Sequence, residues 1–313
     1  MKAIDQETFG GPDVLRLVEI PEPAPRPGRA RVRVTAAAVN PVDLAARAGW
    51  LRPFMPELEP PFVVGSDFAG TVLDGDGPYP AGTRVAGLAP WFVTHEGTYA
   101  EVISVDPAWL APIPDALDDV SAASVPLSAQ TASQSLDLLG LQAGQTVLIT
   151  GASGSVGGFA VQLAGQRGAR VLAVSSANDE DYVAGLGAER VLPRTGTSED
   201  LVAAIRAAVP GGVDAALDTG SLGAAVIGAV RDGGVFLAVN ATAAPPAERG
   251  IDVREMGVQS DGSLLAQLLE AVAAKTLTTR VGATVPLAEA ARAHTTAATH
   301  AVSGKIVLTI PAE

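Results

Sequence analysis

Two rhythms of apolar and polar residues divide the chain. In residues 1–120 short stretches alternate, as in RARVRVTAAAV with Val32 and Val34, and turn clusters such as GDGPYPAG separate them. Alternation with a period of two, bounded by turn residues, indicates half-buried strands. We therefore expect this part to be rich in β-strands and loops, with further strands at FAGTVL, GTRVAGL and TYAEVISV.

From residue 121 the pattern changes to apolar runs alternating with helical spacing. SAASVPLSAQTASQSLDLLG predicts a helix with Ser121 as its N-cap, and the strand-like runs that follow are TVLIT, ARVLAVS, ERVL, VDAALDT and GVFLAVN. Helices between these runs are expected to begin near Ser155, Asp179, Ser198 and Ser221. Such alternation predicts an α/β domain with a doubly wound parallel sheet.

After residue 249 the alternation stops. A helix at SLLAQLLEAVAAK, a strand near RVGATVP, a helix at LAEAARAHTTAAT and a strand at GKIVLTI remain. Because the parallel sheet is already complete, we expect this segment to return to the first domain. The predicted domains are residues 1–120 with 250–313, and residues 121–249.

The composition of the chain limits the kinds of partner that it can bind. The net charge of −13, with three lysines, argues against binding to nucleic acid, which needs a basic surface. Cysteine is absent, so disulfides and thiolate chemistry are excluded. No apolar run approaches the ~20 residues that span a bilayer, and we expect no secretory signal, because MKAIDQETFGG has no positive region followed by an apolar one. We expect a soluble cytoplasmic protein without a membrane partner.

A glycine-rich turn joins the first apolar run of the second domain to a helix. Gly151, Gly154 and Gly157 are spaced by two residues each in LITGASGSVGG. Glycines at a strand–turn–helix junction let backbone N–H groups approach a pyrophosphate, which the helix N-terminus then favours. The predicted dinucleotide contacts are Gly151, Ser153, Gly154, Ser155, Val156 and Gly157. The alternative is a turn that needs glycine only for tight helix–strand packing.

The residues at the end of the second strand of this domain distinguish an NAD site from an NADP site. NAD sites carry an acidic residue there, whereas this chain has Ser175 and Ser176, whose hydroxyls fit a 2′-phosphate. Arg194 can supply a positive charge from the next loop. The acidic run Asp179–Asp181 opposes this reading unless it caps a helix. We predict NADPH as the cofactor.

These motifs together resemble the zinc-free quinone oxidoreductase group of the medium-chain dehydrogenase/reductase superfamily. The resemblance covers essentially the whole chain and rests on AAAVNPVDLAARAGW, PFVVGSDFAGTV, PAGTRVAGL, EGTYAEVISV, PLSAQTA, TGASGSVG and SGKIVL in that order. It implies a GroES-like β-rich catalytic domain formed by both chain ends and a Rossmann domain between them. It also implies a homodimer, for which the apolar strand GGVFLAVNATAAP could supply a sheet edge.

The resemblance also argues against a catalytic metal. Zinc members of the superfamily bind the metal through a cysteine and a histidine at the positions that Asn40 and Ser66 occupy here. Neither residue is a zinc ligand of the usual kind, and His95, His294 and His300 are interpreted as surface or packing residues. We expect no zinc.

Three candidate catalytic residues follow from the resemblance. Asn40 would contact the nicotinamide ribose or the substrate, Thr131 the nicotinamide end of the cofactor, and Lys305 would point toward the cofactor. Each has a plainer alternative: a turn asparagine before proline, a helix threonine bonded to the backbone, and a solvated lysine. Val239 and Asn240 are expected to meet the carboxamide.

Two further family positions concern the cleft. Asp43 is expected to order the local backbone, and Ala45 stands where quinone reductases of the family often have tyrosine. The scarce aromatic residues gather in two loops and would form walls for a flat apolar substrate; the alternative is that they fill the core. They are Trp50, Phe54, Trp91 and Phe92, with Met55 beside them.

The sequence thus predicts an NADPH-dependent reductase of small quinones or α,β-unsaturated carbonyl compounds. Conjugated acceptors suit a site without a Lewis acid, because hydrogen bonds to a distant oxygen can stabilise the charge that hydride transfer creates there. The alternative from another class is an NADPH-binding structural or regulatory protein without redox turnover.

Overall fold

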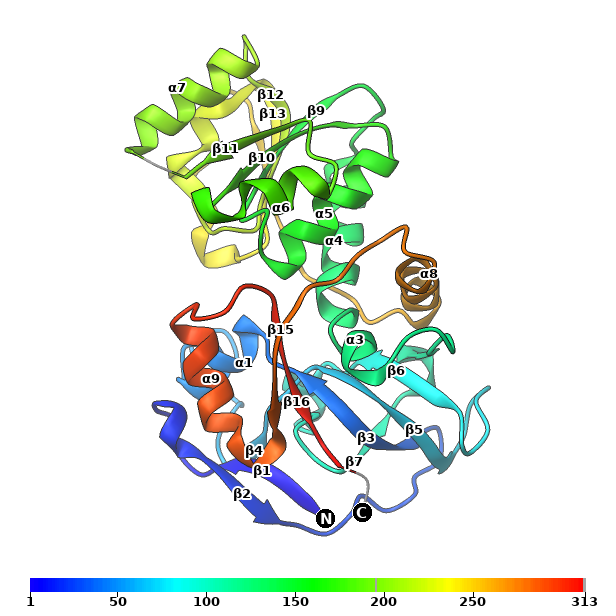
Figure 1. The fold of residues 1–313 in the computed structure, drawn as a ribbon. Coiled ribbons are helices and arrows are strands. Elements are labelled where there is room, and N and C mark those ends of the chain that lie inside the picture. Colours follow the sequence, from blue (N-terminus) through cyan, green and yellow to red (C-terminus); the bar gives the residue numbers. More distant parts are fainter. Residues whose placement is uncertain (195, 312–313) are drawn as a thin grey trace. The chain divides into compact units, whose positions relative to one another are not determined.

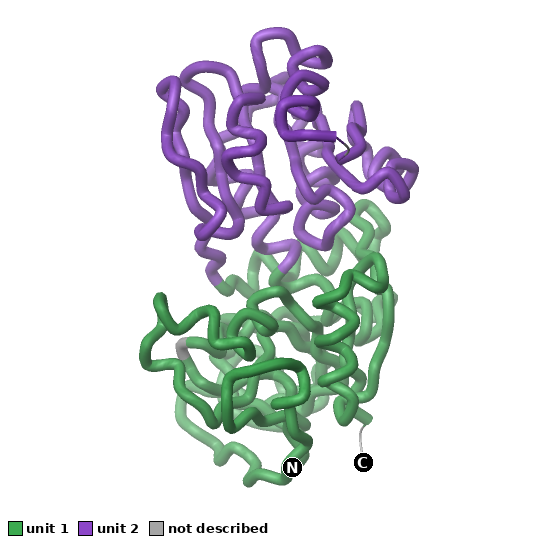
Figure 2. Tube along the Cα trace, turned by 90° about the vertical axis from the view of Figure 1, so that its left-hand side faces the viewer, with its two compact units in different colours: residues 1–127, 260–313 green, residues 128–259 purple. Residues whose placement is uncertain are grey.

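The computed structural model describes residues 1–194 and 196–311, which form two compact units. Residues 1–127 and 260–313 make the first unit, and residues 128–259 make the second (Figure 2). Both ends of the chain therefore contribute to the same unit, and the second unit is an insertion between them.

Antiparallel strands dominate the first unit. A seven-stranded sheet has the order β15-β16-β3-β5-β6-β8, with β7 also paired to β3, and a second sheet has the order β2-β1-β4. The strand bounds are β1 (Lys2–Gln6), β2 (Leu15–Glu19), β3 (Ala30–Ala38), β4 (Phe62–Val63), β5 (Asp67–Gly75), β6 (Arg84–Leu88), β7 (Val102–Val105), β8 (Leu110–Pro112), β15 (Val281–Pro286) and β16 (Lys305–Thr309).

Strand β3 lies at the centre of this sheet and shows the expected alternation of buried residues along its first half. Its last three residues are alanines that are all buried. The C-terminal strand β16 runs antiparallel to it, with Val307 opposite Ala38 (Figure 1). Strand β5 pairs with its other side, with Asp67 also opposite Ala38. The end of β3 is thus where three distant segments meet.

Short helices complete the first unit: α1 (Pro41–Arg47), α2 (Trp91–Thr94), α3 (Asp119–Ala123), α8 (Gly262–Ala273) and α9 (Ala290–Ala298). The short 3-10 turns that accompany them are η1 (Pro12–Val14), η2 (Pro107–Trp109) and η7 (Leu287–Glu289). Helix α3 packs against β3 and β5. Helix α4 (Pro126–Leu139) begins in this unit, and the boundary between the units falls after its second residue.

The second unit is the parallel α/β domain that the alternation predicts. Its six strands have the order β11-β10-β9-β12-β13-β14, all parallel, so the order reverses between β9 and β12. Ligands of such sheets bind at the carboxyl ends of the strands at this reversal. The bounds are β9 (Thr146–Thr150), α5 (Ser155–Gln166), β10 (Arg170–Ser175), η3 (Ala177–Asp179), α6 (Glu180–Gly185), β11 (Arg190–Pro193), α7 (Ser198–Ala208), β12 (Val213–Asp218), η4 (Gly223–Ala225), η5 (Ile227–Ala229), β13 (Val230–Ala238), η6 (Ala241–Ala243) and β14 (Asp252–Glu255).

The sequence pattern does not predict one strand of this sheet. The sheet is not complete at residue 249, because β14 adds a sixth strand outside β13. All four of its residues are exposed or only half-buried, so it carries no apolar signal. Strand β13 consequently has a neighbour on both sides, and the prediction that it offers the free edge for a dimer is wrong. The edge on this side is β14.

Two local expectations also need correction. Among the described residues, no α-helix begins near Ser221. The short turns η4 and η5 lie there instead, because Ser221 and Gly223 have positive φ values of 55° and 48°, which interrupt a right-handed helix. Only glycine fits at position 223, since a Cβ there would lie 2.2 Å from the carbonyl oxygen of Ala243. The segment from residue 121 is split into α3 and α4, and Asp118, rather than Ser121, is the N-cap. Its carboxylate accepts the Ser121 N–H at 2.7 Å.

The unit boundaries lie at 127/128 and 259/260, whereas the sequence pattern places them at 120/121 and 249/250. Helix α3 belongs to the first unit because it packs on that unit's sheet. Residues 250–259 belong to the second unit because they include β14. Within the described residues, no helix is long and apolar enough to cross a membrane.

The two glycines of the turn after β9 allow a stability test of local packing. A Cβ on Gly157 would lie 2.2 Å from the carbonyl oxygen of Gly151, whereas one on Gly154 meets only that oxygen, at 3.2 Å. Gly157→Ala should therefore lower the free energy of unfolding by about 1–3 kcal/mol, and Gly154→Ala by less than about 1 kcal/mol. Urea unfolding of the two variants measures the difference, and equal losses would contradict it.

Candidate active site

The end of β3 and the start of α1 carry the first candidate residue. Asn40 is the N-cap of α1, and its backbone N–H donates to the Asp43 carboxylate at 2.8 Å. Pro41 occupies the first helical position, where a missing N–H does no harm. Asn40 and Asp43 are both buried. The prediction that Asp43 orders the local backbone is confirmed by this hydrogen bond.

Lys305 reaches Asn40 from the other end of the chain. Because β16 runs antiparallel to β3, the first residue of β16 lies beside the residues that follow β3. The Lys305 ammonium donates to the Asn40 Oδ1 at 2.6 Å, and the lysine is only 5 % exposed. It is therefore not a solvated loop lysine. Its Nζ also lies 3.9 Å from the Asp67 carboxylate.

Asp67 was not among the sequence candidates, yet it is at the centre of this cluster. As the first residue of β5 it is fully buried, and its Oδ2 accepts from the Asn40 amide nitrogen at 3.0 Å. Its Oδ1 accepts the backbone N–H of Leu127 at 2.7 Å. Asp67 lies in the motif PFVVGSDFAGTV, but only the pairing of β5 with β3 shows that it contacts Asn40.

Tyr99 and His294 extend the polar cluster. The Tyr99 hydroxyl lies 3.3 Å from the Asp43 carboxylate, to which it donates, and 3.2 Å from His294 Nε2, and both residues are fully buried. The two rings meet edge to face at 5.7 Å. His294 is a packing residue, as expected. Tyr99 supplies a phenol to Asp43 from the motif EGTYAEVISV, in which the sequence analysis did not single out the tyrosine, although position 45 is alanine.

Burial dominates the ionisation of this cluster. It raises the pKa of Asp43 to about 7, against the opposing effect of the Asn40 N–H, while the neighbouring Asp67 raises it further. Burial likewise raises the pKa of Asp67 to about 6, and Lys305 opposes this. The same burial lowers the pKa of Lys305, while Asp67 and Asp43 raise it. The one lysine of this cluster, Lys305, thus lies near two carboxyl groups whose pKa values burial raises to about 6 and about 7.

The remaining groups of the cluster do not titrate near neutral pH. Burial lowers the pKa of His294 to about 3, with Arg47 adding to the effect, so the imidazole is neutral. Burial and Asp43 hold the pKa of Tyr99 well above its ordinary value. Protonation near pH 7 in this cluster is therefore a property of the carboxyl groups.

Asn40 and Ser66 are the residues that the family resemblance places where zinc members have metal ligands. Both are buried, and within the part of the chain that the structure describes the Ser66 hydroxyl has no hydrogen-bond partner. In residues 1–194 and 196–311, no group of three or more His, Cys, Asp or Glu side chains could hold a metal ion. His95 and His300 are exposed.

The glycine turn of the second unit joins β9 to α5. Gly151 has φ 60°, a left-handed conformation that favours glycine, and Gly157 is required by the close approach of the Gly151 carbonyl. Gly154 is exposed and is the N-cap of α5 without a side-chain cap. Packing therefore explains Gly157, whereas Gly154 leaves bare backbone at a helix N-terminus, which suits a phosphate.

Asp218, at the end of β12, ties this turn to its neighbours across the reversal of the strand order. Its carboxylate accepts from the Thr150 hydroxyl and from the Gly223 N–H, the latter at 2.7 Å. Thr150 Oγ1 accepts the Gly220 N–H at 3.0 Å. The sequence did not reveal this link, because it needs β9 and β12 side by side.

Val239 and Asn240 lie on the same loop cluster. The Val239 N–H donates to the Asp218 carbonyl at 3.1 Å, and the Asn240 amide donates to the Ser221 hydroxyl at 3.2 Å. The Asn240 Oδ1 also accepts the Thr242 N–H. The Asn240 side chain thus fixes its own loop.

The structure brings Ser175, Ser176 and Arg194 together at the ends of β10 and β11. The Arg194 N–H donates to the Ser175 carbonyl at 2.7 Å, and the Arg194 side chain is exposed. The buried Ser175 hydroxyl donates to the Ser176 carbonyl. The exposed Ser176 hydroxyl donates to the Asp179 carboxylate at 2.8 Å, so an acidic group also faces this corner.

The aromatic candidates separate into two groups. Trp91 is fully buried and stacks on Phe62 at 5.5 Å, with Phe92 edge-on to it, so these two belong to the core of the first unit. Trp50 and Phe54 are 72 % and 66 % exposed. Thr131 is a buried residue of α4.

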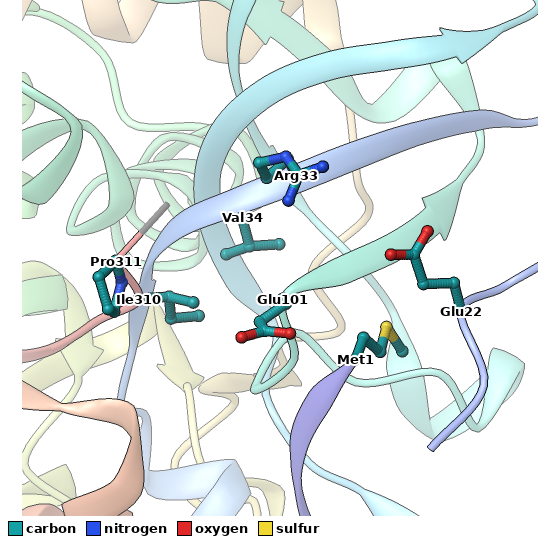
Figure 3. Close-up of a pocket in the computed structure, with 7 residues that line it drawn as sticks. All are labelled: Met1, Glu22, Arg33, Val34, Glu101, Ile310 and Pro311. Atoms are coloured by element: carbon teal, nitrogen blue, oxygen red, sulfur yellow. The ribbon is translucent and has the colours of Figure 1, made fainter. Parts of the chain in front are cut away.

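A pocket elsewhere on the first unit contains none of the predicted residues. It is lined by Met1, Glu22, Arg33, Val34, Glu101, Ile310 and Pro311 (Figure 3). The buried cluster around Asn40, rather than this pocket, concentrates the perturbed ionisable groups that mark functional sites.

The raised pKa of Asp43 makes folding stability depend on pH. An acid whose pKa is raised from about 4 to about 7 by folding stabilises the fold fully below pH 4, and this contribution is lost as pH rises to 7. An asparagine at this position cannot ionise, so the stability of Asp43→Asn relative to the natural chain should increase over this window, by on the order of a few kcal/mol. Urea unfolding at several pH values measures this.

Asp115→Asn, at an exposed turn, is the matched control and should show no such trend. A stability difference between Asp43→Asn and the natural chain that does not vary from pH 4 to 7 would contradict the raised pKa.

Two family models match this chain. The "Alcohol dehydrogenase GroES-like domain" matches residues 26–115, and "Zinc-binding dehydrogenase" matches residues 186–308. Among curated proteins, the chain is 29 % identical over 282 residues to the "NADPH-dependent alkenal/one oxidoreductase, chloroplastic" of Arabidopsis thaliana. That match covers 86 % of this chain and 68 % of the relative.

Solved structures match over the full length. The quinone oxidoreductase from Coxiella burnetii has a TM-score of 0.89 and 29 % identity, covering 99 % of both chains. An NAD-dependent alcohol dehydrogenase has a TM-score of 0.87 and 31 % identity, covering 99 % of this chain and 100 % of the other. With its GroES-like unit formed by both chain ends and its inserted Rossmann unit, this chain belongs to the medium-chain dehydrogenase/reductase superfamily and, within it, to the quinone oxidoreductase group.

Proposed function

We propose that this chain is an NADPH-dependent reductase that transfers hydride to a quinone or to an α,β-unsaturated carbonyl compound, without zinc. The observation that carries the proposal is the buried ammonium of Lys305, held 2.6 Å from Asn40 at a position where zinc members have a metal ligand. A fixed positive charge there is suited to an oxygen that becomes negative during the reaction. The names of the relatives from Arabidopsis and Coxiella support the substrate class.

The second unit offers the groups that would hold the dinucleotide. The exposed backbone at Gly154, with the N-terminus of α5, fits the pyrophosphate, and Ser153, Ser155 and Val156 flank it. Asp218 links the end of β9, just before this turn, to the loop that follows β12. When bound, NADPH supplies the hydride from its nicotinamide ring.

Arg194 and Ser176 support NADPH over NADH. A guanidinium and a hydroxyl at the end of the second strand are suited to a 2′-phosphate. Asp179 weakens this preference, because its carboxylate accepts from Ser176 at the same corner. One structural neighbour is named as NAD-dependent, so the choice of dinucleotide is decided by these side chains and not by the family.

Lys305 and Asn40 would act on the acceptor. Hydride addition to a conjugated carbon places negative charge on the carbonyl or quinone oxygen, and an ammonium group stabilises that charge and can donate a proton to it. Burial lowers the pKa of Lys305, and Asp67 and Asp43 oppose this, so the two carboxyl groups favour the charged form of the lysine. Zinc is not needed in this scheme, and the amide of Asn40 and the hydroxyl of Ser66 are poor ligands for it.

Turnover with reduced dinucleotide tests the proposal. NADPH consumption, followed by absorbance, is expected with several quinones or enones, and NADPH formation from NADP⁺ is not expected with saturated alcohols as hydride donors. Lys305→Met should lower kcat by roughly 100-fold, as loss of one oxyanion-stabilising group does, while the dissociation constant for NADPH stays the same. Tight NADPH binding without turnover on any acceptor would instead favour a structural or regulatory protein.

A charge substitution tests the cofactor preference. Arg194→Gln should weaken NADPH binding by about tenfold or more, because a charge-assisted hydrogen bond contributes roughly 1.5–3 kcal/mol, and should leave NADH binding unchanged. Arg190→Gln, which removes an exposed arginine from the start of β11, is the matched control. Fluorescence titration measures both constants, and an equal loss for both dinucleotides would count against a 2′-phosphate contact.

A further inference from the structure

Asp67 contacts the site through two hydrogen bonds, one from each carboxylate oxygen. Oδ2 accepts from the Asn40 amide nitrogen at 3.0 Å, and Oδ1 accepts from the backbone N–H of Leu127 at 2.7 Å. Leu127 lies in the first turn of α4, where N–H groups have no partner within the helix. Because this backbone donor is fixed by the helix, it also fixes the plane of the carboxylate.

The carboxylate decides which way the Asn40 amide faces. With Nδ2 directed at Asp67 and at the Ala38 carbonyl, Oδ1 is left to accept from the Lys305 ammonium. In the opposite orientation two oxygen atoms would face each other at Asp67, and two sets of N–H donors would face each other at Lys305. Both contacts would be repulsive in a buried site.

We propose that Asp67 is the positioning residue of the reductase site: through its two hydrogen bonds it sets the orientation of the Asn40 amide, which in turn holds the Lys305 ammonium in place. This inference rests on the proposed function, in which Lys305 acts on the acceptor oxygen. Asp67 itself is fully buried behind Asn40 and acts through its neighbours.

The two hydrogen bonds require residue 67 to accept twice. An asparagine there has one acceptor and one donor, and the fixed Leu127 N–H claims the acceptor. The new NH2 group would then face Asn40, which must turn its Oδ1 toward it and present its own NH2 to Lys305. Asp67→Asn should therefore displace the lysine although the shape of the side chain is unchanged.

The exchange of the two residues should restore the contact with Lys305 and the hydrogen bond between positions 40 and 67, although the hydrogen bond to the Ala38 carbonyl is lost. In the double variant Asn40→Asp with Asp67→Asn, the amide NH2 at position 67 donates to the carboxylate at position 40, and the second oxygen of that carboxylate accepts from Lys305. The buried cluster keeps the same number of charges. Asn40→Asp alone has no such solution, because it places a second carboxylate against Asp67.

The experiment compares these three variants with the natural chain, with Asp115→Asn at an exposed turn as the matched control. Asp67→Asn is expected to lower kcat by roughly 10- to 100-fold, as a small misplacement of a catalytic group does, with an unchanged dissociation constant for NADPH. Asn40→Asp should also lose activity. The double variant should recover at least about tenfold in kcat over Asp67→Asn, and the control should match the natural chain.

Two results overturn the proposal: a kcat of Asp67→Asn equal to that of the natural chain, or a double variant no better than its poorer parent. If Asp67→Asn does not fold, the double variant decides alone, since a folded and active double variant requires the exchanged pairing and an unfolded or inactive one rejects it.

Failure of the proposed function is recognised separately, by a natural chain that binds NADPH but reduces no acceptor. The urea midpoints of the natural chain and the three variants then still test the orientation of Asn40. The orientation of Asn40 is supported if the double variant loses less stability than the sum of the losses in the two single variants. It is rejected if these losses are additive.

Discussion

The pairing of β16 with β3 is the contact on which the site depends. It joins residues near 307 to residues near 38, and so it places a lysine from the last strand against an asparagine from the first forty residues. Strand β5 pairs with the other side of β3 and adds Asp67 at the same level. Sheet register alone therefore brings together one cation, one amide and one carboxylate from three distant segments.

Burial gives this arrangement its chemistry. In water these side chains would have ordinary pKa values and little mutual preference. Covered by the packing around β3, the carboxyl groups of Asp43 and Asp67 hold protons more tightly, and both groups oppose the lowering of the Lys305 pKa that burial causes. A buried ammonium without a counter-charge is too unfavourable to persist. The acidic residues thus favour the charged form of the lysine.

The candidate sites of the two units are built from different backbone geometry. The parallel sheet of the second unit directs strand ends and a helix N-terminus to one edge, and the anion site that we propose there is made of backbone groups and needs few charged side chains. The antiparallel sheet of the first unit instead buries side chains in its interior, so its site depends on specific residues. Glycine is required in the first case, and matched hydrogen-bond partners in the second.

Local patterns were enough to predict the order of strands and helices in residues 146–238, apart from the helix expected near Ser221. They also predicted the glycine turn and the two-unit organisation, because apolar periodicity and glycine spacing are properties of neighbouring residues. They also pointed to Asn40 and Lys305, through a resemblance carried by short motifs. Strand β14 was missed because an exposed edge strand has no apolar pattern, and the turns near Ser221 because the constraint on Gly223 comes from Ala243.

The roles of Asp67, Tyr99 and Asp218 as partners, and of Trp91 as a core residue, emerged only from the folded chain. These roles arise from strand register and burial. Strand register and burial bring together residues that are far apart in the chain, so the identity of the neighbouring residues does not reveal these roles.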